Sequence, residues 1–224
     1  MNVFALLGIS FLPALLFFVL AVILNKDFKI RWGLFAGALG LLTVVPTSLI
    51  QYYVLSLPIF NGYTFASVMV TAVIFNGLIE EAMKMLFMCP IPQKKQNLSA
   101  FFCCAILFGL FVGGFESVVY VVRKFQEITL ISGKEIVLKL LFGRIFSAQA
   151  IHVFCSGLLA LYLWNFRNGQ KNIMPFVYAV LLHGIYNFFA GFSSGYRWLA
   201  LAAILFAAVE CRIFYLTARD GKKE

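Results

Sequence analysis

The chain has 224 residues, of which 62% are hydrophobic and only 12% are charged. A soluble domain of this length carries roughly twice that share of charged side chains, so the composition excludes a water-soluble protein and predicts a multi-span membrane protein. The net charge of +9 does not indicate nucleic-acid binding, because the Lys and Arg residues gather at the ends of apolar runs, where they meet anionic lipid head groups.

Seven apolar runs are long enough to cross roughly 30 Å of hydrocarbon as helices. Backbone polar groups must be paired within each segment in lipid, so we expect every run to be α-helical. No linker divides the chain, and the prediction is one all-α domain over residues 1–224, a polytopic transmembrane helix bundle. The predicted spans are Val3–Leu24, Gly33–Val54, Thr64–Cys89, Ala100–Val122, Ile145–Trp164, Met174–Phe192 and Trp198–Thr217.

The segment Arg123–Arg144 differs from the spans on either side of it. Charged residues such as Lys134 and Lys139 are mixed there with Ile, Val and Leu. This amphipathic pattern predicts a helix lying at the membrane interface before the fifth span. The alternative is a tilted extension of the fifth span itself.

The orientation is predicted from the charges that follow the first span. The N-terminus lacks the basic region and cleavage site of a signal peptide, so we expect the first span to be retained. Lys26, Lys29 and Arg31 follow this span directly, which predicts a cytoplasmic first loop. The N-terminus is then outside and the C-terminus cytoplasmic.

Ionisable side chains inside the predicted spans are few, and each costs about 2.5–3.5 kcal/mol at the bilayer centre. Both histidines of the chain are among them. The five cysteines form no Cys-x-x-Cys pair, and we interpret them as small packing residues. The polar residues within spans are Glu80, Glu81 and Lys84 in the third, Glu116 in the fourth, His152 in the fifth, His183 and Asn187 in the sixth, and Glu210 and Arg212 in the last.

Glu80, Glu81 and Lys84 are spaced so that one ammonium group can reach both carboxylates on the same helix. Lys84 can neutralise one Glu, and the other remains as a spare acid or base. Such a carboxylate is suited to activate water. The structural alternative is an internal ion cluster that fixes helix packing.

His183 and Asn187 lie four residues apart, on one face of the sixth span. Together they can offer an imidazole N–H and an amide N–H to one oxyanion. The alternative is a pair of interhelical hydrogen bonds that serve packing. His152 taken alone is more typical of a core residue than of a catalyst.

Four motifs follow one another on consecutive spans: EEAMK at Glu80–Lys84, GFE ending at Glu116, HVFCS from His152 and HGIYN from His183. Over roughly 75–189 they resemble the PrsW family of bacterial membrane-embedded proteases, which is related to the CAAX prenyl endopeptidases and the bacteriocin-immunity membrane proteins. The marks of that family are EExxK, a Glu in the next helix, a His in the one after, and a final HxxxN. One departure is Val112, where an aromatic residue is expected.

The resemblance implies an endopeptidase with a catalytic core near 75–189. It also implies that the substrate is a membrane-anchored regulatory protein such as an anti-sigma factor, which receives its first cut near the outer face of the membrane in a bacterial stress response. Water has to reach the site through a cavity among the third to sixth spans.

Two mechanisms fit the same residues. In the metal-free version, which we favour from the sequence, Glu80 activates water and His183 with Asn187 binds the oxyanion, while His152 and Glu116 orient water or substrate; Glu81 is the next candidate for the base. In the alternative, Glu116, His152 and His183 are three zinc ligands and Glu80 is the base.

Other function classes use similar residues. A non-catalytic immunity-type protein or a transporter can also carry buried carboxylates and histidines, but a transporter more often shows paired repeats or broken spans. A haem carrier using His152 and His183 would leave the paired carboxylates unexplained.

Overall fold

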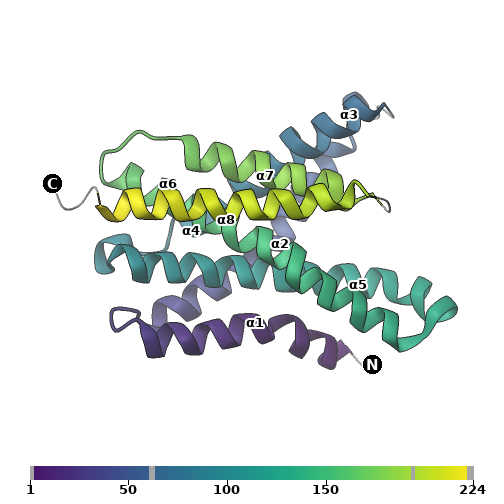
Figure 1. Cartoon of the computed structure of the whole chain (residues 1–224), viewed down its shortest axis with the longest axis horizontal. Helices are drawn as coiled ribbons and strands as arrows, with labels where there is room; N and C mark the ends of the chain where they lie inside the picture. The colour runs from purple at the N-terminus through teal and green to yellow at the C-terminus, as the bar shows by residue number, and fades with distance from the viewer. Residues whose placement is uncertain (1–2, 61–63, 193–194, 221–224) are drawn as a thin grey trace.

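The computed structural model describes residues 3–60, 64–192 and 195–220, except for the side chains of Val3 and of residues 124–134. All regular elements in this part of the chain are helical (Figure 1). Their order is α1 (Val3–Leu24), α2 (Ile30–Leu55), η1 (Pro58–Phe60), α3 (Phe65–Val70), η2 (Thr71–Asn76), α4 (Gly77–Met88), η3 (Gln93–Lys95), α5 (Leu98–Arg144), η4 (Ile145–Gln149), α6 (Ala150–Arg167), α7 (Met174–Ala190) and α8 (Arg197–Asp220).

Six stretches of the described chain are long and apolar enough to cross a membrane, and α7 is a shorter apolar helix. The predicted polytopic helical bundle is therefore confirmed. The six stretches are Phe4–Leu24, Ile30–Leu55, Phe65–Met88, Leu98–Arg123, Glu135–Arg167 and Arg197–Asp220.

α5 folds back on itself, as Figure 1 shows at one end of the molecule. The guanidinium carbon of Arg144 lies 4.3 Å from the centroid of the Tyr120 ring. A straight helix would separate residues 24 positions apart by about 36 Å. Val121 and Val137 also belong to one buried cluster, so the two arms of α5 run side by side.

The second arm of α5, which begins near Glu135, occupies the region where an interfacial helix was predicted. From Glu135 the chain continues through η4 and α6 to Arg167 as one apolar stretch of 33 residues. The structure thus agrees with the alternative interpretation of this segment, an extension of the fifth span. Lys134, which contributed to the amphipathic pattern, lies outside the described side chains.

The centre of the bundle is formed by α6 and by the first arm of α5, Leu98–Arg123. Phe101, Leu107 and Phe108 of α5 are buried completely or almost completely, as are Ile151 and Leu158 of α6. The outer faces of α1, α2 and α8 instead expose many large apolar side chains. This pattern suits a protein whose solvent is lipid, because lipid tails are as apolar as the side chains that face them.

Glycines let the helices that carry the polar residues approach closely. A Cβ added to Gly77 of α4 would lie 2.5 Å from the carbonyl oxygen of Val180 in α7. A Cβ added to Gly113 of α5 would lie 2.8 Å from Gln149 Cα at the end of η4. Small residues at such contacts are typical of packed transmembrane helices. The first contact is one turn from Glu80 and the second one turn from Glu116.

We expect Gly77→Ala to destabilise the bundle by about 1–3 kcal/mol, because the added methyl group would push α4 away from α7. Thermal unfolding of the detergent-solubilised protein measures this change. Gly8→Ala is the matched control, since nothing lies within 4 Å of a Cβ at Gly8. Equal stability of the two variants would contradict the close α4–α7 contact.

Candidate active site

The first half of the site is carried by α4, directly after the π-helical turn η2. Irregular turns of this kind occur often at functional sites. Glu80, Glu81 and Lys84 are all buried, with relative exposures of 8%, 0% and 1%. Three charged groups out of contact with solvent have to be balanced by partners inside the protein.

Glu81 is the carboxylate that Lys84 neutralises. Lys84 Nζ lies 2.7 Å from Glu81 Oε1 and 3.4 Å from His183 Nδ1. His183 Nδ1 in turn donates to the same oxygen of Glu81. Within the described part of the chain, Lys84 makes no ion pair with Glu80, so the expectation that one ammonium joins both carboxylates holds for Glu81 only.

Glu80 has other partners. Its Oε2 lies 2.9 Å from His183 Nε2, yet this oxygen has no aligned hydrogen bond. Its Oε1 accepts a hydrogen bond of 2.8 Å from Gln51 Nε2, and the same amide donates to Asn76 Oδ1 at 2.5 Å. Both ring nitrogens of His183 therefore face carboxylates, one from each Glu.

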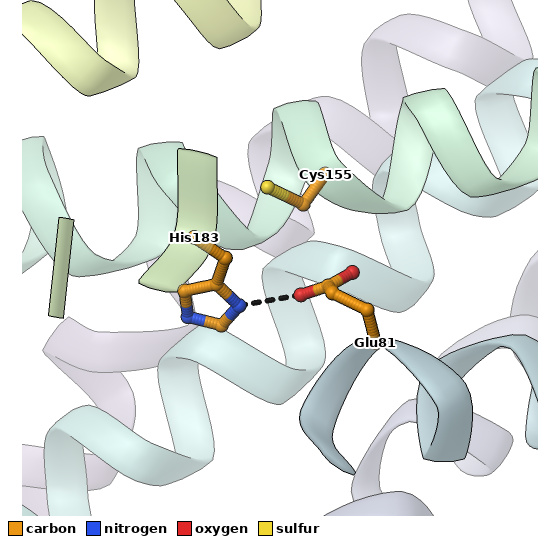
Figure 2. A group of neighbouring side chains, drawn as sticks. All are labelled: Glu81, Cys155 and His183. Atoms are coloured by element: carbon orange, nitrogen blue, oxygen red, sulfur yellow. Dashed lines mark hydrogen bonds and ion pairs between the residues drawn. The ribbon is translucent and has the colours of Figure 1, made fainter. Parts of the chain in front are cut away.

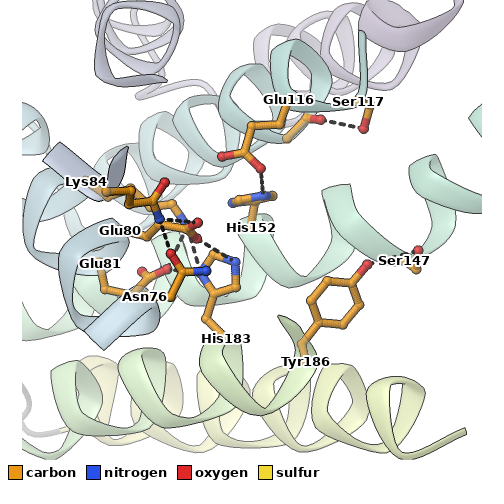
Figure 3. A network of polar contacts seen from close by, with 12 residues as sticks. Asn76, Glu80, Glu81, Lys84, Glu116, Ser117, Ser147, His152, His183 and Tyr186 are labelled. Carbon is orange, nitrogen blue, oxygen red and sulfur yellow. Dashed lines mark hydrogen bonds and ion pairs between the residues drawn. The ribbon is translucent and has the colours of Figure 1, made fainter. Parts of the chain in front are cut away.

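The second half of the site joins α5 and α6. His152 Nε2 and Glu116 Oε2 are 2.9 Å apart and hydrogen-bonded. The ring of His152 packs edge-on against that of His183, with centroids 4.7 Å apart. Figure 3 shows how this contact joins the Glu116–His152 pair to the cluster of Glu80, Glu81, Lys84 and His183. The structure thus brings six of the predicted site residues together.

A cavity of about 1060 Å³ reaches the second half of the site. Glu116, His152 and Asn187 are among its lining residues, whereas Glu80 and His183 are not. Glu116 is also the most accessible carboxylate of the cluster, with 29% of its side chain exposed. The polar residues thus divide into a buried cluster and a group that faces the cavity.

Asn187 is one helical turn from His183, as predicted, but the two side chains have different surroundings. Asn187 lines the cavity, while His183 is 1% exposed and turns its nitrogens to Glu80 and Glu81. The expected pair of donors for one oxyanion is therefore not assembled in this structure.

One group of possible metal ligands among the described residues has donor atoms all within 4.8 Å of one another, namely Glu81, Cys155 and His183 (Figure 2). Lys84 already places an ammonium group beside Glu81 and His183. Cys155 Sγ donates to the carbonyl oxygen of Ala179 at 3.5 Å. This group therefore already contains a cation. The predicted zinc ligands Glu116, His152 and His183 do not form such a group.

Two potential donor atoms of the site are left unpaired, although Glu80, His152 and His183 do not meet the 4.8 Å spacing in this structure. Glu80 Oε2 and His152 Nδ1 are buried and have no hydrogen-bond partner in the described chain. The other nitrogen of His152 is held by Glu116, and Nδ1 of His183 by Glu81. A carboxylate on the far nitrogen is the usual arrangement for a metal-ligating histidine. Two imidazoles and one carboxylate also match the ligands of known zinc peptidases.

Two residues of the site were not predicted from the sequence, Gln51 and Asn76. Gln51 is an amide inside the second predicted span, and a polar side chain at such depth is a usable signal. Asn76 precedes Glu80 by four residues, which places it on the same face of a regular helix. In the described part of the chain, Glu210 and Arg212 of the last span form no ion pair with the cluster and do not line the cavity.

A family model described as PrsW family intramembrane metalloprotease matches residues 28–209. Neither a curated protein nor a solved structure matches the chain. The family match includes α2, which supplies Gln51, and extends well beyond the motifs quoted above on both sides.

Proposed function

The chain belongs to the PrsW family of intramembrane metalloproteases, and we propose that it makes the first cut in a membrane-anchored regulatory protein such as an anti-sigma factor. Membership of this family makes it a membrane-embedded, multi-pass peptidase. The observation that supports the proposal best is the cavity that reaches Glu116, His152 and Asn187. Hydrolysis needs both water and a peptide at the reactive groups, and a cavity of this size has room for them.

The proposal includes a metal ion that Glu80, His152 and His183 would hold, for which their donor atoms would have to move closer together than in this structure. It departs from the metal-free mechanism favoured by the sequence, because His183 turns both nitrogens to carboxylates and is not free to bind an oxyanion. It also differs from the predicted zinc set, since Glu80 replaces Glu116 as the carboxylate ligand. Zinc held there would polarise the scissile carbonyl group and activate a water molecule.

The residues of the chain then have distinct roles. Glu116, the carboxylate that lines the cavity, accepts the proton of the attacking water and returns it to the leaving amine. Asn187 donates an N–H to the carbonyl oxygen of the substrate as charge develops on it. Glu81 with Lys84 holds the ring of His183 in place.

The position of the cavity supports a cut near one membrane surface. Its lining includes Tyr120 near the end of the first arm of α5, Ala190 at the end of α7 and Arg197 at the start of α8. With the predicted orientation, this is the outer surface. We propose one membrane domain, in which the catalytic core of 75–189 is extended by Gln51 from α2.

The proposal is tested by comparing bacteria that make the wild-type protein with bacteria that make Glu116→Gln. New protein N-termini in the membrane fraction are identified by mass spectrometry. We expect at least one single-span membrane protein to be cut in the wild type and to accumulate intact in the variant. Identical sets of termini would favour the non-catalytic, immunity-type or transporter-like alternative.

Metal content gives a separate prediction. We expect the purified wild type to retain about one zinc ion per chain, because a site with two imidazoles and one carboxylate holds zinc tightly. His152→Ala and Glu80→Gln should lose the ion, and elemental analysis measures this directly. Asn187→Ala is the matched control and should keep it. Wild-type protein that is active with no stoichiometric metal would restore the metal-free mechanism.

A further inference from the structure

The cavity that reaches the site is lined by three cations and one carboxylate. Lys139 and Arg144 come from the second arm of α5 and Arg197 from the start of α8, while the carboxylate is Glu116. None of the three cations makes an ion pair with a described residue. The positive charge of the cavity is thus not balanced within the part of the chain that the structure describes.

Arg144 is the least accessible of the three cations. Its guanidinium group stacks over the Tyr120 ring at 4.3 Å, and its Nε is buried without a hydrogen-bond partner. A buried donor left without an acceptor costs free energy. A guanidinium group is a good donor for a carboxylate, which it can bind through two parallel hydrogen bonds.

The remaining walls of the cavity are largely apolar. Ile136, Leu140, Trp198 and Leu201 are among the lining residues. The cavity therefore offers an apolar surface together with cationic groups, near the end of α7 and the start of α8. This combination suits the end of a transmembrane helix that is followed by a negatively charged segment.

We propose that the cavity selects polypeptides that carry acidic side chains next to their membrane span, with Lys139, Arg144 and Arg197 acting together as the contacts. The inference extends the proposed peptidase function by naming its substrate class. An anionic lipid head group would offer similar charge. The polypeptide fits better, because the same cavity continues to Glu116, His152 and Asn187, which a peptide bond has to reach.

Binding rather than cleavage tests this inference. Three fluorescent peptides share one apolar span and differ only in the segment after it, which is rich in Asp, Gln or Lys. Each is titrated against Glu116→Gln protein in phosphatidylcholine nanodiscs. We expect the Asp peptide to bind about tenfold more tightly than the Gln peptide, and the Lys peptide more weakly than both. The preference should shrink in 1 M salt, where the Debye length is about 3 Å.

Charge reversal provides the matched comparison. Lys139 and Arg197 are exposed, so Lys139→Glu with Arg197→Glu should fold normally and shift the preference to the Lys peptide. Lys171→Glu reverses an exposed cation in the connection between α6 and α7 and should leave the preference unchanged. Equal binding of the three peptides, or a preference that survives the double reversal, would overturn the inference.

Two further outcomes separate the explanations. A preference for the Asp peptide that disappears when a small share of phosphatidylglycerol is added would assign the cations to lipid and overturn the inference. Because the assay requires no cleavage, it is independent of the peptidase test. Acid selection without any cut membrane protein would reject the proposed function alone, and cleavage without acid selection would reject the inference alone.

Discussion

Replacing Glu116 by Gln is expected to lower the rate of substrate cleavage by about 10²–10⁴-fold, the usual effect of losing a general base. The amide keeps a carbonyl oxygen that accepts the hydrogen bond of His152 Nε2, so His152 should stay in place. It cannot accept the proton of water. Single-turnover cleavage of the substrate found in the membrane fraction measures the rate, and thermal unfolding checks that the variant is folded.

The comparison with Glu80→Gln assigns the two carboxylates. We expect Glu80→Gln to lose both metal and activity, and Glu116→Gln to lose activity but keep the metal. The opposite result, in which Glu116→Gln cleaves at a near-normal rate and Glu80→Gln keeps its metal but not its activity, would return the base role to Glu80, as the sequence predicted.

Replacing Lys84 by Met is expected to destabilise the protein by about 3–5 kcal/mol, the cost of removing one partner from a buried ion pair. Lys84 is 1% exposed, and its ammonium group lies 2.7 Å from Glu81 Oε1. The variant would leave Glu81 buried without its cation. Unfolding in a denaturing detergent measures the change.

Two further variants control for the loss of the Lys84 side chain. Lys171→Met removes an exposed Lys and should change the stability little. Lys84→Met combined with Glu81→Gln should regain much of the lost stability, because the two residues are in direct contact. If Lys84→Met alone is as stable as the wild type, the buried ion pair is not a structural element.

The sequence predicted the spans well because each is a long apolar run, and lipid allows such a run only one backbone structure. The motif spacing also indicated that Glu80, Glu81 and Lys84 lie together, since residues three and four apart are neighbours on a helix. Both predictions depend on local properties of one segment at a time.

The partners across helices could not be predicted in the same way, because they depend on how each helix is rotated against its neighbours. The close contact at Gly77 shows how near α4 and α7 lie to each other. In this packing His183 faces the two Glu residues, whereas Asn187 lines the cavity. The sequence also left open how the chain passes from the fourth to the fifth span, since a charged stretch between two apolar runs is compatible with either an interfacial helix or an extension of the fifth span.

The ammonium group of Lys84 balances the negative charge of Glu81 in the buried half of the site, so this half needs no metal ion for charge balance. It is a cation that is covalently attached to the chain and placed where Glu81, Cys155 and His183 could otherwise gather a metal ion. A chelator cannot extract it, and the supply of metal in the cell does not affect it. On the proposed assignment, the folding of the protein therefore does not depend on a bound metal ion, whereas its peptidase activity does.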